Sequence, residues 1–391
     1  MVGIPATPDR LAAAAAAMAV QAQLRAGFPA NAGAAVVLSD DRQGAVSPDE
    51  PLHVPAPGGA PPMVFTGERL GARSALPALL EVAVASGAPA CALVEPLPRD
   101  GAPEWLHWLL DPVLRGGFDV VCPAYRRRKL ENLLNTGLAY PLTRALFGRR
   151  LRQPLGREIA LSRRLAERIL EAPDGGPEGE GGEDLWVITQ ALSRECRVCE
   201  SFLGPRPPPR GPVPEVPQAL ASLLGTIFHE LELHAPLWQR TRSSGPVETF
   251  GDPGMLEDAA GRPDVAPLVS AFALGWQDLR SLWAAVLPPQ ALLALQRLPR
   301  DPPEAFRMGD RLWARIVYDF AVGWRVKAMD RAQLLRSMAP LYLGWAAGWV
   351  NEVAALDAAA SEARAERLCE AFEAEKPYLI SRWRWPDRFL P

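Results

Sequence analysis

The sequence predicts an α/β chain, with a mostly parallel sheet covered by helices on both faces and an all-helical region after it. In the first half, short apolar runs alternate with helical patterns, which is typical of strands buried on both sides. After the proline-rich segment 204–217, apolar residues recur only at helical spacing. We therefore expect two domains, residues 1–210 and residues 211–391.

The first-half strands are expected to be parallel, so ligands should bind beyond their carboxyl ends. The expected strands cover residues 2–5, 34–38, 63–66, 90–94 and 118–122. The segments that follow them should border one crevice, and these are residues 5–7, 39–41, 67–71, 95–97 and 123–127. The glycine-rich segment 172–183 has no periodicity and is predicted to be a mobile surface loop that could close over the crevice as a lid.

Helical patterns fill the second half of the chain. They cover residues 219–238, 265–287, 303–326, 331–356 and 359–373. Tryptophans recur near helical spacing and should pack these helices together, at positions 276, 283, 313, 324, 345 and 349. This helical region is also the candidate surface for a homo-oligomer.

Composition excludes several classes of protein. Hydrophobic residues make up 48% and charged residues 22%, as in ordinary globular proteins. A net charge of -3 lacks the basic excess that nucleic-acid binding needs. We expect no membrane span, because no charge-free apolar stretch reaches about twenty residues. Five cysteines form no disulfide framework, which predicts a cytoplasmic protein, and Cys196 and Cys199 are expected to be structural.

Residues 118–162 carry a family resemblance. The segment contains Tyr125 followed by arginines, then Tyr140-Pro141-Leu142, and then Gln153-Pro154-Leu155-Gly156. In this order and spacing, the motifs resemble nucleotide-sugar glycosyltransferases of the GT-A fold, of the mannosylglycerate synthase type with a helical C-terminal half. Two later segments, 315–320 and 340–345, are also similar, so the resemblance spans nearly the whole chain.

The resemblance implies transfer of a hexose from UDP- or GDP-hexose to a small polar acceptor such as glycerate. It makes residues 1–210 the nucleotide-sugar-binding domain. Pro5 falls in the first nucleotide-binding strand, and Asp40 falls where the family has an acid for the ribose or base. The family's phosphate-binding lysine is replaced by Glu68, so Arg69 or Arg73 becomes the candidate cation there.

The resemblance also implies Mg²⁺ or Mn²⁺, held by two acids one residue apart and a later histidine. Those positions fall on Glu95, Leu97 and Pro208, of which only Glu95 can bind a cation. Arginines can bind phosphate without metal, and the candidates are Arg126, Arg127 and Arg157. For the basic residues 126–129, the alternative is a solvated basic surface.

Two acids keep the family's catalytic positions. Glu158 closes the 153–158 hinge, where the family has a carboxylate near the sugar hydroxyls. Asp184 matches an aspartate close to sugar and acceptor, although an acid in the first turn of a helix is also favoured by the helix dipole. We expect the candidate acids and arginines to converge on one cleft.

Two other functions remain open. A degenerate GT-A protein would bind a nucleotide, a sugar or a protein partner without catalysis. A nucleotidyltransferase would use the same crevice but depends on metal still more. The missing metal ligands favour the first of these alternatives over the second.

Overall fold

The computed structural model describes residues 1–4, 19–20, 22–24, 36–40, 63–66, 75–94, 105–156, 158–172, 182–205, 215–251, 263–298 and 302–386. Five candidate site residues, Pro5, Arg69, Arg73, Glu95 and Arg157, lie outside these ranges, as does most of the segment 172–183. Asp40 is described only as backbone, in a strand.

The described chain forms two compact units that interleave along the sequence. The first unit holds residues 1–126, 151–213 and 247–254, and the second holds 127–150, 214–246 and 255–391. The predicted domain division at residue 210 stays a prediction, and each unit is described by itself.

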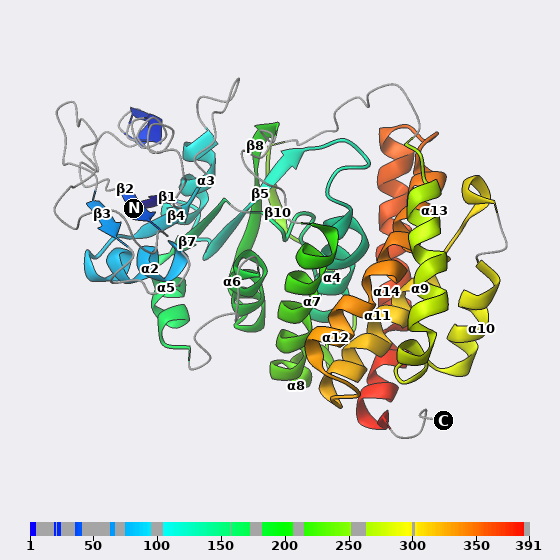
Figure 1. Cartoon of the computed structure of the whole chain (residues 1–391). Coiled ribbons are helices and arrows are strands. Elements are labelled where there is room, and N and C mark those ends of the chain that lie inside the picture. Colours follow the sequence, from blue (N-terminus) through cyan, green and yellow to red (C-terminus); the bar gives the residue numbers. More distant parts are fainter. Residues whose placement is uncertain are drawn as a thin grey trace. The chain divides into compact units, whose positions relative to one another are not determined.

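A single mostly parallel sheet organises the first unit (Figure 1). Its strands are β1 (Val2–Ile4), β2 (Val36–Asp40), β3 (Met63–Thr66), β4 (Ala90–Leu93), β5 (Val120–Arg126), β7 (Ile159–Ser162), β8 (Val198–Pro205) and β10 (Glu248–Phe250). They lie in the order β10-β8-β5-β7-β4-β1-β2-β3, and only β7 runs against its neighbours. The predicted fold class is confirmed.

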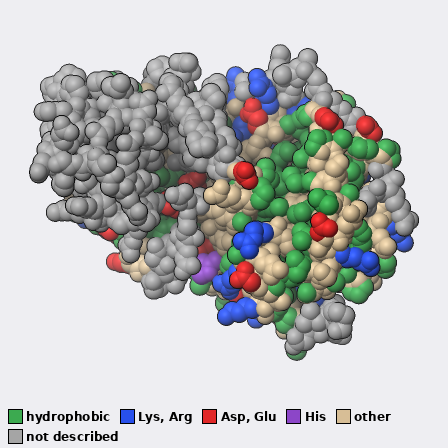
Figure 2. All heavy atoms as spheres, viewed as in Figure 1, with side chains coloured by type: hydrophobic (Ala, Val, Ile, Leu, Met, Phe, Trp, Pro, Cys, Tyr) green, Lys and Arg blue, Asp and Glu red, His purple; other side chains and the backbone are tan. Residues whose placement is uncertain are grey.

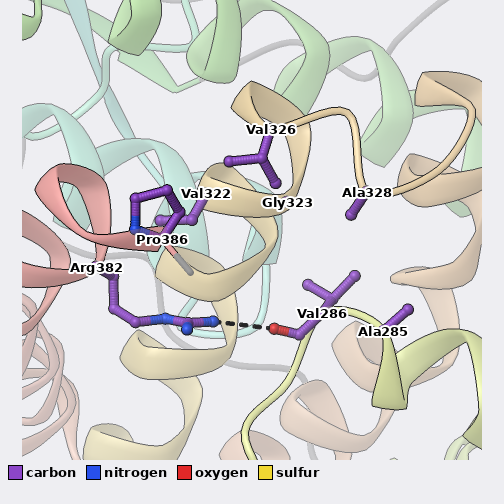
Figure 3. Close-up of a pocket in the computed structure, with 8 residues that line it drawn as sticks. All are labelled: Ala285, Val286, Val322, Gly323, Val326, Ala328, Arg382 and Pro386. Carbon is purple, nitrogen blue, oxygen red and sulfur yellow. Dashed lines mark hydrogen bonds between the residues drawn. The ribbon is translucent and has the colours of Figure 1, made fainter. Parts of the chain in front are cut away.

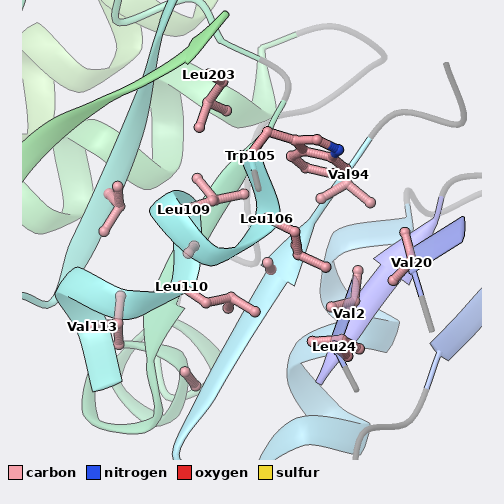
Figure 4. Packing of buried hydrophobic residues seen from close by; sticks show 14 of the residues in the cluster. Val2, Val20, Leu24, Val94, Trp105, Leu106, Leu109, Leu110, Val113 and Leu203 are labelled. Carbon is pink, nitrogen blue, oxygen red and sulfur yellow. The ribbon is translucent and has the colours of Figure 1, made fainter. Parts of the chain in front are cut away.

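Helices cover both faces of this sheet. They are α2 (Ala75–Ala85), α3 (Trp105–Leu114), α5 (Arg163–Leu170) and α6 (Glu183–Ser193). Val2 and Ile4 belong to the same hydrophobic cluster as Trp105 and Leu109 of α3 (Figure 4). Gly3 between them faces α2, where an added Cβ would lie 2.9 Å from a methyl carbon of Leu79. Successive residues therefore alternate between the two helical layers, as a doubly covered sheet requires.

The second unit is mainly helical. Its elements are the short π-helix η1 (Asn135–Ala139), α4 (Tyr140–Phe147), β6 (Arg149–Arg150), α7 (Val216–Leu233), α8 (Ala235–Trp238), β9 (Gly245–Pro246), α9 (Ala266–Ala284), α10 (Pro289–Arg297), η3 (Pro303–Ala305), α11 (Asp310–Arg325), α12 (Arg331–Ser337), α13 (Ala339–Val353) and α14 (Ala358–Arg384). The predicted helix over 331–356 is divided into α12 and α13 just before Pro340, since proline is favoured in the first turn of a helix.

Tryptophans pack this unit, as the helical spacing predicts. Trp313 and Trp345 are buried, and their rings stack with centroids 5.6 Å apart. The Trp313 indole N–H donates to the Gly137 carbonyl over 2.8 Å. A Cβ on Gly137 would lie 2.3 Å from the Trp345 ring, so glycine allows η1 to approach α13 closely.

Residues 219–373 were expected to be wholly helical, and this is wrong over 245–250. β9 pairs with β6, while β10 joins the first unit's sheet beside β8. The segment Ser243-Ser244-Gly245-Pro246, which ends in β9, disfavours a helix through glycine flexibility and the missing proline N–H. The Phe250 ring then meets the Phe118 ring edge-on at 5.7 Å, which anchors the short strand.

A buried ion pair joins α11 to α14. The Arg382 Nε donates to the Asp319 carboxylate over 2.9 Å, and the Tyr378 hydroxyl donates to the same carboxylate over 2.7 Å. A second nitrogen of Arg382 donates to the Val286 carbonyl, beside a small hollow lined by apolar side chains (Figure 3). Burial raises the pKa of Asp319 to about 6, although Arg382 and Tyr378 oppose the shift.

Hydrophobic side chains spread over much of the second unit's surface in Figure 2, with acidic and basic side chains scattered among them. Leu274 on α9 and Leu293 on α10 are 59% and 55% exposed. A homo-oligomer through this unit stays a prediction. Within the described residues, no helix has the length and hydrophobicity needed to cross a membrane.

Candidate functional site

A buried tyrosine–carboxylate pair lies at the carboxyl end of β5. The Tyr125 hydroxyl donates to the Glu158 carboxylate, and both residues are 1% exposed. Glu158 directly precedes β7. Because β7 runs antiparallel to β5, the residue before β7 lies beside the end of β5, where ligands of parallel sheets bind.

From here on the hinge is residues 151–156, the segment before Glu158, and it crosses β5 at close range. A Cβ on Gly156 would lie 2.1 Å from Cγ of Pro123, a distance no side chain tolerates. Glycine is therefore required for the segment 151–156 to pass over the strand. This close approach gives a physical reason for the Pro154-Leu155-Gly156 motif.

Gln153 fastens the same segment to Tyr125. Its side-chain Nε2 donates to the Tyr125 carbonyl over 2.9 Å, and its Oε1 accepts from the Tyr125 N–H over 3.3 Å. The amide thus bonds both backbone groups of one residue, as a neighbouring strand would. The backbone of Tyr125 is held at the end of β5 by this side chain.

Glu200 is a second buried acid at this place, and it was not among the residues predicted from the sequence. It lies on β8 opposite Cys122, is 2% exposed, and accepts the Gln153 N–H over 3.1 Å. Burial raises the pKa of Glu200 to about 7, and the N–H groups of Gln153 and Arg152 and the Arg152 charge act against the rise. An ionisable residue inside a strand buried on both faces was the available signal.

The predicted basic run 126–129 divides between the two units. Arg126 ends β5, is half-buried, and lies over the Phe202 ring at 5.6 Å. Arg127 belongs to the second unit, so its place in the site stays a prediction. Lys129 donates to the carbonyls of Ala354 and Leu356 at the end of α13, which is a structural role.

Asp184 lies in the first turn of α6, half-buried. The pKa of the Cys122 thiol is raised well above its usual value, mainly by burial and then by nearby groups that include Glu200 and Asp184.

Tyr125 and Cys122 point to opposite faces of β5. Tyr125 belongs to the hydrophobic cluster on the α3 face, whereas Cys122, an odd number of residues away, points to the other face. Tyr125, Arg126 and Glu158 thus lie at the end of β5. The convergence of the candidate acids and arginines on a single cleft, Asp40 and Glu95 included, stays a prediction.

No family model matches the chain, and no curated protein sequence matches it significantly. Solved structures similar to it include glucosyl-3-phosphoglycerate synthase from Mycobacterium tuberculosis with phosphoglyceric acid, at 20% identity over 59% of this chain and 78% of that one, with a TM-score of 0.43. The same enzyme with Mn²⁺, uridine diphosphate and phosphoglyceric acid is 21% identical over 58% of this chain and 77% of that one, with a TM-score of 0.43. A mycobacterial protein is 20% identical over 67% of this chain and 79% of that one, also with a TM-score of 0.43.

Another structure of that synthase holds Mn²⁺, uridine diphosphate glucose and phosphoglyceric acid. At this identity and TM-score, the likeness carries no statement about the chemistry of this chain.

Proposed function

We propose that the protein is a glycosyltransferase that moves a hexose from a nucleotide diphosphate sugar to a small polar acceptor. The observation that carries the proposal is the buried Glu158 carboxylate, oriented by Tyr125 at the carboxyl end of β5. Sugar hydroxyls donate hydrogen bonds to carboxylates, and a fixed carboxylate orients a sugar without reorganising.

Arg126 supplies the complementary charge for the donor in this proposal. Its guanidinium is half-buried over Phe202 at the end of the strand that carries Tyr125. Arginine binds phosphate oxygens through paired hydrogen bonds and keeps its charge at every physiological pH. If Arg126 binds the diphosphate, the hexose attached to it would lie near the acids around β5. Arg127, Arg69 and Arg157 are the further candidates from the sequence.

Asp184 is proposed to act on the acceptor. An aspartate at the start of α6 can accept a hydrogen bond from the acceptor's hydroxyl and so orient that hydroxyl. Its partial exposure suits a group that meets an incoming small molecule.

A divalent cation, when bound, would neutralise charge that develops on the leaving nucleotide. Glu95, the candidate ligand, lies outside the described residues. Within the ranges that the structure describes, no cluster of three or more His, Cys, Asp or Glu residues could hold a metal ion.

A second function is a binding module that retains the nucleotide-sugar crevice without catalysis. The observation that favours it is the burial of Glu158, because a carboxylate that is 1% exposed and already accepts a hydrogen bond presents little surface to a reacting sugar. The sequence adds Leu97 in place of a metal-binding acid.

Calorimetry and a transfer assay separate the two functions. UDP and GDP are titrated into the protein, and UDP-glucose or GDP-mannose is then incubated with glycerate or phosphoglycerate, with and without Mn²⁺. Mass spectrometry detects the glycosylated acceptor. The panel includes UDP-glucose and phosphoglycerate, the pair present in a solved glucosyl-3-phosphoglycerate synthase structure.

The matched variants are Glu158→Gln and, as the control, Glu131→Gln, an exposed acid that pairs with Arg128 at 3.8 Å. Product formation that Glu158→Gln abolishes and Glu131→Gln preserves supports the transferase. Nucleotide binding with no product from any pair supports the binding module. If neither nucleotide binds, both proposals fail.

A further inference from the structure

We propose that Glu200 is a positioning residue for Glu158, acting through the backbone of the 151–156 segment, through Gln153 and through Tyr125. The inference rests on the proposed function for its catalytic meaning, because Glu158 is the acid assigned to the sugar there. The chain of contacts itself stands on geometry within the first unit. Glu200 is not expected to touch the substrate.

Glu200 lies where an apolar residue would be expected. It is 2% exposed on a strand whose neighbours Cys199 and Ser201 are fully buried. A buried carboxylate lowers stability unless it accepts hydrogen bonds. Glu200 accepts the N–H of Gln153 over 3.1 Å and also that of Arg152. The carboxylate therefore fixes two consecutive peptide groups of the hinge to β8.

Gln153 carries this constraint to β5. Its backbone N–H is bound to Glu200, while its side chain bonds both the N–H and the carbonyl of Tyr125. A change in the Gln153 backbone must move its side chain, and the Tyr125 backbone with it. Tyr125 in turn donates to Glu158. Four residues from β8, the hinge, β5 and the start of β7 thus form one continuous hydrogen-bonded path.

Ionisation makes this path sensitive to pH. The charged carboxylate accepts the hinge N–H groups more strongly than the protonated form, because charge-assisted hydrogen bonds are stronger. Burial raises the pKa of Glu200 to about 7, into the physiological range. The ionisable groups around this position are Cys122 on β5, Cys199 on β8, Arg152 in the hinge, Asp184 on α6 and, beside Cys199, Glu248 on β10.

The test follows the Tyr125 amide by NMR and does not need activity. The chain has five tyrosines, so ¹⁵N-tyrosine labelling gives a sparse spectrum, and Tyr125→Phe assigns the signal. We expect the Tyr125 amide shift of the wild type to titrate with a midpoint near the Glu200 pKa of about 7. In Glu200→Gln, which keeps an acceptor oxygen of similar shape, the titration should vanish.

Two further variants keep the inference testable if Glu200→Gln folds poorly. Gln153→Ala breaks the path but leaves Glu200 in place, so the Tyr125 titration should also vanish. Glu248→Gln removes an exposed carboxylate from the adjacent strand and should leave the titration unchanged. A Tyr125 signal that does not respond to pH in the wild type, or that still titrates in Glu200→Gln, overturns the inference.

The pH dependence of sugar transfer then shows whether the hydrogen-bonded path from Glu200 to Glu158 affects catalysis. The kcat of the wild type should fall about fivefold below the midpoint, the effect of one weakened hydrogen bond, and Glu200→Gln should lose this step in its pH profile. A wild type whose kcat has no such step, despite a titrating Tyr125, removes the positioning role. If the wild type transfers no sugar, the proposed function fails, and the NMR result alone decides the contact path.

Discussion

Tyr125 and Glu158, 33 residues apart in the chain, are joined by a hydrogen bond from the tyrosine hydroxyl to the carboxylate in the interior of the first unit. The bond exists because β7 enters the sheet between β4 and β5 in the opposite direction. It connects the sequence motif after β5 with the hinge motif before β7. Two motifs that are separate in the sequence are therefore in direct contact in the folded chain.

A double-mutant cycle should measure this bond. Tyr125→Phe leaves a buried carboxylate without its hydroxyl donor and should lower the free energy of unfolding by about 1–3 kcal/mol. Glu158→Gln should cost a similar amount. Because the side chains interact directly, the two losses should not add, and chemical denaturation of the four proteins gives the coupling. Full additivity would show that the hydroxyl does not stabilise the acid.

The sheet and the helical half could be predicted from the sequence, because both depend on local apolar periodicity. The antiparallel strand β7 was not predicted, since a four-residue apolar run does not show its direction. β10 was missed because three exposed residues, Glu248–Phe250, carry no apolar pattern. Its strand state depends on pairing with β8.

The candidate site was partly predictable for the same reason. Glu158 and Arg126 were selected from motifs next to strand ends, and both are found at the end of β5. Glu200 was missed because its role depends on Gln153, a contact 47 residues away in the chain. Periodicity predicts which residues are buried. It does not identify the partner that makes a buried acid tolerable.

The hinge glycine should be intolerant of substitution. Gly156→Ala would place a Cβ 2.1 Å from Pro123, so the segment must move away from β5. We expect a loss of about 1–3 kcal/mol in stability, as for overpacked cores, together with lost nucleotide-sugar binding. Gly245→Ala is the matched control, because a Cβ there meets nothing within 4 Å. Equal melting temperatures for both variants would contradict the close approach.

Removal of a single arginine should separate binding from stability. Arg126→Ala should weaken UDP or GDP binding at least about tenfold, the value of a charge-assisted hydrogen bond to phosphate. Its melting temperature should fall by only a few degrees, because the contact that is lost is a cation–π contact with Phe202, which contributes about 0.5–1 kcal/mol at a partly exposed site. Arg128→Ala, which removes an exposed arginine paired with Glu131, should bind like the wild type. Equal affinities for all three proteins would remove Arg126 from the site.

The buried pair in the second unit should be costly to break. Asp319→Ala leaves the Arg382 guanidinium, which is 2% exposed, without its carboxylate. We expect a loss of about 3–5 kcal/mol in unfolding free energy. Asp310→Ala, which removes a more exposed partner of Arg364, should cost clearly less. Comparable losses for the two variants would show that burial does not set the cost.

Glu200 should make stability fall as the pH rises. In the folded chain burial raises the Glu200 pKa from its ordinary 4.5 to about 7, so the folded state binds this proton more tightly than the unfolded state. The favourable contribution is complete below the unfolded pKa and is lost as the pH rises through the folded pKa.

Glu200→Gln removes this titration and keeps a neutral side chain of nearly the same shape. The variant should therefore gain unfolding free energy relative to the wild type as the pH rises from 5 to 8, by an amount on the order of a few kcal/mol. Urea unfolding at several pH values measures the difference, with Glu248→Gln as the control for loss of an exposed negative charge. A difference between Glu200→Gln and the wild type that stays constant across this range would mean that Glu200 does not titrate there. In that case the carboxylate would remain charged at the hinge, and catalysis could not be linked to its protonation.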